Sequence, residues 1–135
     1  MTIKDLDCND EVEAAIWAAF ESWGDPFKKR LAENGPQWVL DGLIRLLERI
    51  EDPNTAVLRD DWVGYLSRRD ALHILEKLVP SSVWKPYWVQ TRTFDQKLRH
   101  SWIHGECLVR IPPKPEDEFW WYYGVPEGLS ETLDS

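Results

Sequence analysis

The stretch LRHSWIHGECLVRI, residues 98–111, marks the point where the pattern of the chain changes from helical to alternating. Read as a strand, it directs alternate residues to opposite faces, with Ile103, Cys107 and Val109 on a core face. The opposite face mixes imidazole, indole, carboxylate and guanidinium groups. With Tyr87–Phe94 as the strand before it, a tight hairpin turn at Asp95 and Gln96, and Phe119–Tyr123 as the strand after it, the stretch predicts a three-stranded antiparallel β-meander.

The chain before this stretch has helical signals. Asn9 can cap a first helix that Gly24 ends, a second helix is expected over Pro26–Glu33, and Pro36 opens a strongly apolar helix that Asp52 and Pro53 close. Asp60 or Asp61 can start a short helix, and a new helix is expected from Ser67 to Val79. The sequence therefore predicts an α+β fold in which four to five helices pack on the meander.

Length and composition fit one soluble domain. The 135 residues are 43% hydrophobic and 30% charged, and we expect a helical part over 9–79, a meander over 87–124 and a flexible acidic tail over 125–135. Cys8 and Cys107 do not form a disulfide framework. A membrane-length apolar run and a secretory signal are both missing from the sequence, so the cytoplasm is the expected compartment.

The net charge of −8 is unevenly distributed. Residues 1–25 carry −6, residues 116–135 carry −6, and the middle of the chain carries +4. Such a body repels a phosphate backbone at long range and attracts a basic protein surface, although acidic ends can also serve solubility alone. Nine tryptophans are more than a small core hides easily, and exposed indoles are common interface anchors.

Candidate chemistry is limited to a few residues. His100, His104 and Cys107 have metal-like spacing beside Glu106, but on a strand Cys107 points away from both histidines. His100 and His104 would lie roughly 13 Å apart on a strand, too far for joint acid-base catalysis. We therefore predict no metal, no cofactor and no enzyme activity.

Nucleic-acid binding is a weaker alternative. Residues 77–115 carry a net charge of +5, and tryptophan, tyrosine and phenylalanine are interleaved with the basic residues. Single-strand recognition uses such a combination of bases and aromatic rings. The acidic ends of the chain oppose it.

The combined profile favours a protein that binds another protein. In size, acidity and single domain it resembles, by type rather than by motif, immunity proteins and phage inhibitors of CRISPR effectors. We expect a small inhibitor that covers a basic, nucleic-acid-binding surface of a nuclease or CRISPR effector. The alternative is a structural or regulatory subunit that self-associates, for instance as a homodimer, through its aromatic face. The expected contact residues are Glu13, Trp17, Glu21, His100, Trp102, His104, Glu106, Glu116, Asp117 and Glu118.

Overall fold

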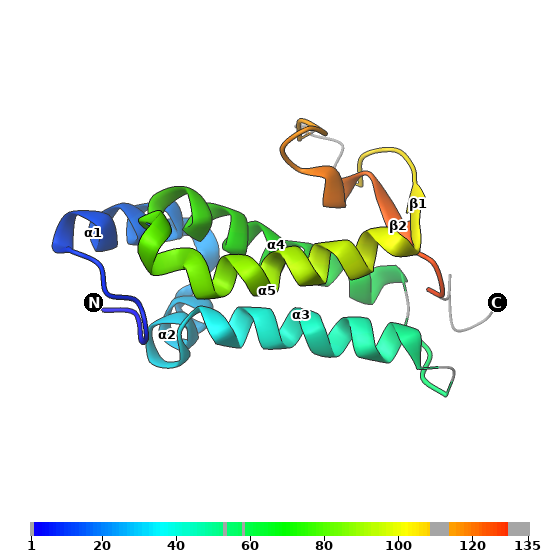
Figure 1. Cartoon of the computed structure of the whole chain (residues 1–135), viewed down its shortest axis with the longest axis horizontal. Helices are drawn as coiled ribbons and strands as arrows, with labels where there is room; N and C mark the ends of the chain where they lie inside the picture. The colour runs from blue at the N-terminus through cyan, green and yellow to red at the C-terminus, as the bar shows by residue number, and fades with distance from the viewer. Residues whose placement is uncertain (1, 53, 58, 109–113, 130–135) are drawn as a thin grey trace.

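The computed structural model describes residues 2–52, 54–57, 59–108 and 114–129. It is mostly helical, with α1 (Asp10–Ala19), α2 (Asp25–Asn34), α3 (Pro36–Glu51), α4 (Arg59–Leu78) and α5 (Ser81–His100). Two strands follow, β1 (Trp102–His104) and β2 (Gly124–Pro126), together with the short 3₁₀ helices η1 (Glu21–Trp23) and η2 (Trp120–Tyr122). The α+β class holds in this coarse sense. Figure 1 shows α1 and α2 at one end of an elongated molecule and the strands at the other.

The first three helices begin where the sequence signals predict, and α2 and α3 also end there. Asn9 caps α1, because its Oδ1 accepts a hydrogen bond of 2.9 Å from the Val12 N–H. Gly35 separates α2 from α3 with a φ of 75°, and a Cβ there would meet the Lys4 carbonyl oxygen at 2.4 Å. The predicted starts of these three helices are confirmed, and so are the ends of α2 and α3. The predicted end of the first helix at Gly24 is wrong, because α1 ends at Ala19 and Gly24 follows the separate 3₁₀ helix η1. Pro53, predicted to help close the third helix, lies outside the described residues.

The predicted break at Ser67 is wrong. α4 is continuous over 20 residues, and the Ser67 hydroxyl donates to the Gly64 carbonyl oxygen (3.4 Å) inside the helix instead of capping a new one. Trp62, Leu66 and Leu72 are all buried, so the two predicted segments form one apolar face.

The predicted strand Tyr87–Phe94 and the hairpin turn at Asp95 and Gln96 are also wrong, because α5 covers this region. Thr91 and Thr93 donate their hydroxyls to the carbonyl oxygens four residues earlier, at 2.8 and 3.0 Å. The buried positions recur at helical spacing along α5: Trp84, Tyr87, Thr91, Phe94, Asp95 and Leu98. Burial of this stripe therefore overrides the β propensity of the threonines.

The sheet has two strands within the described residues, so the three-stranded meander is not found. β1 pairs antiparallel with β2, and Ile103 lies opposite Val125. Among the described residues of the predicted middle strand, Trp102–His104 alone form a strand, and the predicted third strand Phe119–Tyr123 contains the 3₁₀ helix η2. A Cβ on Gly124 would lie 2.2 Å from the Ile103 carbonyl oxygen, so the strands meet only because this residue is glycine.

Two predictions extend beyond the described residues. The predicted middle strand includes 109–111, and the predicted flexible tail includes 130–135, all of which lie outside them. Val125 and Pro126, at the start of that tail, belong to β2.

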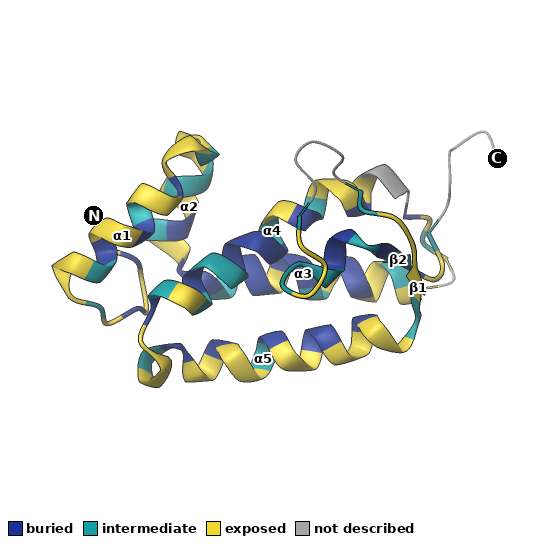
Figure 2. Cartoon of the chain, turned by 90° about the horizontal axis from the view of Figure 1, so that it is seen from above, coloured by how far each residue is buried: buried dark blue, intermediate teal, exposed yellow. Residues whose placement is uncertain are grey.

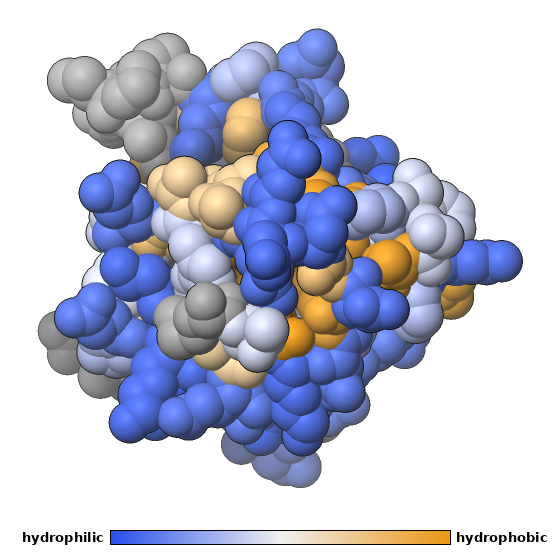
Figure 3. Space-filling model, turned by 90° about the vertical axis from the view of Figure 1, so that its left-hand side faces the viewer, coloured by the Kyte–Doolittle hydropathy of each residue, from blue (hydrophilic) through white to orange (hydrophobic). Residues whose placement is uncertain are grey.

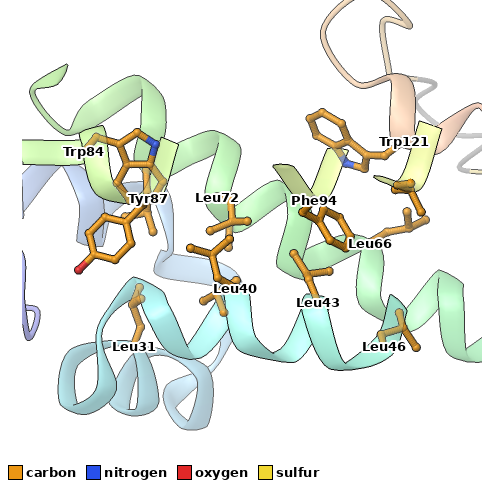
Figure 4. Packing of buried hydrophobic residues seen from close by; sticks show 14 of the residues in the cluster. Leu31, Leu40, Leu43, Leu46, Leu66, Leu72, Trp84, Tyr87, Phe94 and Trp121 are labelled. Atoms are coloured by element: carbon orange, nitrogen blue, oxygen red, sulfur yellow. The ribbon is translucent and has the colours of Figure 1, made fainter. Parts of the chain in front are cut away.

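The core lies between α3, α4 and α5. Figure 4 shows Leu40 and Leu43 of α3, Leu66 and Leu72 of α4 and Phe94 of α5 gathered around one interior. Figure 2 shows that α5 buries one face and exposes the other along its length. Among the described residues, every helix is too short or too polar to cross a membrane.

Candidate partner-binding site

The predicted contact residues do not form one surface. Glu13, Trp17 and Glu21 lie on α1 and η1, at the opposite end of the molecule from β1 and the loop before η2 (Figure 1). Any single docking face can therefore include only one of the two groups.

The α1 group differs from the predicted acidic border around an indole. Glu13 is buried with 9% of its surface exposed, and Trp17 is half-buried. Trp17 and Glu21 share a shallow depression with Asp25, Lys28 and Lys29 of α2, so the surroundings carry both signs of charge. Figure 3 shows that this end of the molecule is largely hydrophilic, with only small hydrophobic areas between polar residues.

The other group gathers at the C-terminal end of α5. His100 is the exposed last residue of α5, so it does not share a strand face with Trp102, His104 and Glu106 as predicted. Trp102 is half-buried, with its ring 6.0 Å from the ring of Trp62 and 5.2 Å from that of Trp120, measured between centroids. His104 and Glu106 are exposed beside it.

An acidic loop, Glu116–Glu118, lies next to this end and is held in place by its own side chains. The His104 ring pairs with Glu116 at 2.5 Å, and the His73 ring pairs with Glu118 at 2.7 Å. Lys77 also donates to Glu118, and Asp117 Oδ1 accepts the Glu118 backbone N–H at 3.0 Å. Glu116 and Asp117 nevertheless remain exposed. The carboxylates are therefore presented to solvent by a fixed backbone.

An aromatic cluster supports the loop from below. The ring centroid of Phe119 lies 5.4 Å from that of Trp121 and 5.0 Å from that of His73. The Tyr123 hydroxyl donates to the carbonyl oxygen of Lys114, two residues before the loop. Phe119 and Trp121, which the sequence predicts to belong to a third strand, instead pack against His73 and so fix the loop on α4.

Buried polar groups of α4 and α5 bind this cluster. Asp70 accepts hydrogen bonds from Trp121 Nε1 (2.8 Å) and from the Tyr122 hydroxyl. Burial, and secondly the bond to Asp70, raise the pKa of Tyr122 above its ordinary value. Arg69 forms two hydrogen bonds with Asp95, of 3.0 and 2.8 Å, and its guanidinium carbon lies 4.0 Å from the centre of the Trp121 ring. The sequence analysis does not predict that Arg69, Asp70 and Asp95 are buried or that they support the loop.

A polar hollow opens between α4, α5 and the loop. Arg69, Arg92 and Arg99 line it together with Glu76, Asp117, Glu118 and neighbouring rings. Two of its arginines have partners within the hollow: Arg92 pairs with Glu76 at 3.2 Å, and the Arg99 guanidinium carbon lies 4.1 Å from the centre of the Trp120 ring. The described part of the chain contains no group of three or more His, Cys, Asp or Glu residues placed to hold a metal ion.

The Glu118 contacts predict a pH dependence of stability. Hydrogen bonds from Lys77 and then from His73 lower the pKa of the Glu118 carboxyl below its ordinary value. A carboxyl with a lowered folded-state pKa stabilises the fold above its unfolded pKa of about 4.3, and this contribution disappears as the pH falls through the folded value. Glu118→Gln is therefore expected to lower Tm at pH 7 and to flatten the decline of Tm between about pH 5 and pH 3.

The measurement is thermal unfolding of both proteins across this pH range. Glu33→Gln, at an exposed position on α2, is the matched control and should follow the parent curve. Parallel curves for Glu118→Gln and the parent would contradict the prediction.

Comparison of the chain with protein-family models, curated proteins and solved structures finds no match. Functional argument therefore depends on the site itself.

Proposed function

We propose that this protein is an inhibitor that binds a basic partner protein through the acidic loop Glu116–Glu118 and the neighbouring Glu106. The observation that carries the proposal is the exposure of Glu116 and Asp117 in a loop that hydrogen bonds and an aromatic base hold in place. A loop that is ordered before binding loses less conformational entropy on association, so more of its interaction energy appears as affinity.

Electrostatics supports the same proposal. The chain carries −8 overall, and a field of this sign increases the rate of encounter with a cationic surface. The partner would present a basic surface of the kind that nucleases and CRISPR effectors use for nucleic acid, as in immunity-type and anti-CRISPR inhibitors. Since that surface is what such a partner needs for its own substrate, covering it would inhibit the partner.

The internal contacts of the basic residues weigh against the nucleic-acid alternative. Lys77 is engaged by Glu118, Arg92 by Glu76, and Arg99 by the ring of Trp120. Lys114 lies 4.7 Å from the ring centre of Phe119. These side chains would have to leave their partners before they could contact phosphates.

The experiment is capture of a partner by tagged protein from the likely host, followed by identification of the partner and assay of its activity. Replacing Glu106, Glu116 and Asp117 by their amides is expected to weaken binding at least about tenfold, a loss of about 1.4 kcal/mol, and to restore the partner's activity. The matched control removes the same charge from Asp7, Asp10 and Glu11, which are exposed at the opposite end.

The control should bind within about twofold of the parent, because only the local carboxylates contact the partner. Equal weakening by both triple variants would show that total charge, not this loop, directs binding. A captured partner whose activity is unaffected would contradict the inhibitory role.

A further inference from the structure

A groove between α3 and α5 is distinct from the acidic loop and has a different character. α3 and α5 run in the same direction along the long axis (Figure 1). Most of its surface area is apolar, although polar side chains stand along its edges, and it encloses about 200 Å³. The residues that line it are Ile44, Leu47, Glu48, Glu51, Val89, Gln90, Thr93, Phe94 and Lys97.

The floor of the groove is part of the core, and its edge is open. Leu47 and Phe94 are 6% and 3% exposed, and Figure 4 shows Phe94 pointing from α5 toward Leu43 of α3. Val89, on the α5 edge, is 52% exposed, which is high for a valine beside an apolar floor. An apolar group placed in this groove would therefore cover Val89 and extend the core outward.

The α3 edge is acidic. Glu48 and Glu51 are exposed and line the groove, whereas Arg45 lies about 100° around the helix from Ile44 and faces elsewhere. At the other end of the groove the amides of Gln37 and Gln90 form two reciprocal hydrogen bonds of 2.8 and 2.9 Å, which join α3 to α5. Lys97 is the basic residue on the α5 edge.

We propose that this groove binds an amphipathic helix of a partner protein, with apolar side chains facing Leu47, Val89 and Phe94 and basic side chains facing Glu48 and Glu51. The volume favours side-chain anchors, because pockets for small molecules typically enclose roughly 300–1,000 Å³. Two helices with an apolar channel between them suit a third helix, whose residues at i, i+3, i+4 and i+7 enter the channel. Charge complementarity with the α3 edge selects a basic flank.

The test uses two labelled synthetic peptides of about 18 residues, long enough to form a marginal helix. Both have the same leucine face, and the flank beside it carries lysines in one and glutamates in the other. Fluorescence anisotropy should show at least about tenfold tighter binding of the lysine peptide to the full chain. The double variant E48K/E51K should reverse this preference.

Val89→Asp should weaken binding of the lysine peptide at least about tenfold. Val63→Asp is the matched control, because Val63 is also an exposed valine on a helix, at 43%, and does not line the groove. It should bind within about twofold of the parent. Circular dichroism of each variant checks that the helices remain folded.

Three results would overturn the inference: equal affinity for both peptides, insensitivity to V89D, or a dimer in solution that V89D converts to monomer. The last would assign the groove to a second copy of the chain. The inference goes beyond the proposed function, since the loop variant lacking the charges of Glu106, Glu116 and Asp117 should bind the lysine peptide as the parent does. The peptide experiment can therefore contradict the groove proposal without contradicting the proposal for the acidic loop, and the partner experiment can do the reverse.

Discussion

Asp95→Ala is expected to lower the free energy of unfolding by about 3–5 kcal/mol, a large fraction of the roughly 5–15 kcal/mol typical of a domain. Asp95 and Arg69 are 5% and 4% exposed, and their double hydrogen bond joins α5 to α4. Without Asp95, the Arg69 guanidinium stays buried but loses both hydrogen bonds to the carboxylate that neutralises its charge. Arg69 Nη1 already lacks a hydrogen-bond partner among the described residues. In the variant, Nε and Nη2 would lose their acceptor as well.

A second ion pair between the same helices provides the control. Glu76 of α4 pairs with Arg92 of α5 at 3.2 Å, but the Arg92 side chain is 44% exposed and that of Glu76 is 24% exposed. Water screens such a pair, so Glu76→Ala should cost at most about 1 kcal/mol. Urea unfolding followed by circular dichroism measures both variants, and similar losses for the two would contradict the prediction.

A paired apolar replacement separates the cost of an orphaned charge from the value of the bridge. Arg69→Met with Asp95→Leu removes both charges, and buried ion pairs replaced in this way are often neutral or more stable. The double variant is therefore expected to recover much of the stability that Asp95→Ala loses. A loss as large as that of Asp95→Ala would contradict this expectation. It would mean that the ion pair gives net stabilisation to the packing of α4 on α5, and that the cost of Asp95→Ala is not mainly the unpaired charge of Arg69.

The sequence predicts where the first three helices begin because these starts are marked locally. Asn9 caps α1 through a bond three residues away, and Gly24 and Gly35 adopt a positive φ directly before α2 and α3. A preference expressed within one turn of the chain can be read without knowing what the segment packs against.

The prediction fails where tertiary contacts outweigh local preference. Thr91 and Thr93 favour a strand in isolation, yet Tyr87, Thr91 and Phe94 form a helical stripe that α3 and α4 bury. Asp95, which is predicted to lie in a hairpin turn, instead lies on α5 as the buried partner of Arg69. The two residues are 26 positions apart, and local periodicity contains no information on such a pairing.

The candidate site shows the same division. The acidity of Glu116–Glu118 is visible in the sequence, but the support from His73, Lys77 and Asp70 comes from α4, more than 40 positions earlier. Asp70 and Arg69 occur within a helical pattern where charged residues usually face solvent. They are buried because the aromatic segment Phe119–Tyr123 packs on α4. The sequence pattern of this segment predicts a third strand, not a segment that covers a helix.

Trp121→Ala is expected to destabilise the protein by about 3–5 kcal/mol, the range for truncating a large buried aromatic side chain. Trp121 is 1% exposed, donates to Asp70 at 2.8 Å, and lies against the guanidinium of Arg69. Truncation leaves a cavity, removes one of the donors to Asp70, and removes the ring that covers the Arg69 and Asp95 pair. We therefore expect η2 and the acidic loop to detach from α4 before the helices unfold.

Two further variants divide this effect into parts. Trp121→Phe keeps most of the ring volume and removes the N–H, so its cost should be about 1–3 kcal/mol, the penalty for a buried acceptor that loses a donor. Trp88→Ala is the matched control, because Trp88 is 45% exposed on α5, and it should change stability by about 0.5 kcal/mol or less. Hydrogen exchange at the backbone amides of Gly105 and Leu108, which bond to Tyr123 and Tyr122, should accelerate in Trp121→Ala before exchange in α3 does. If exchange in both regions accelerated equally, the aromatic segment and the helices would unfold as one unit, and the loop would depend on the whole core rather than on Trp121.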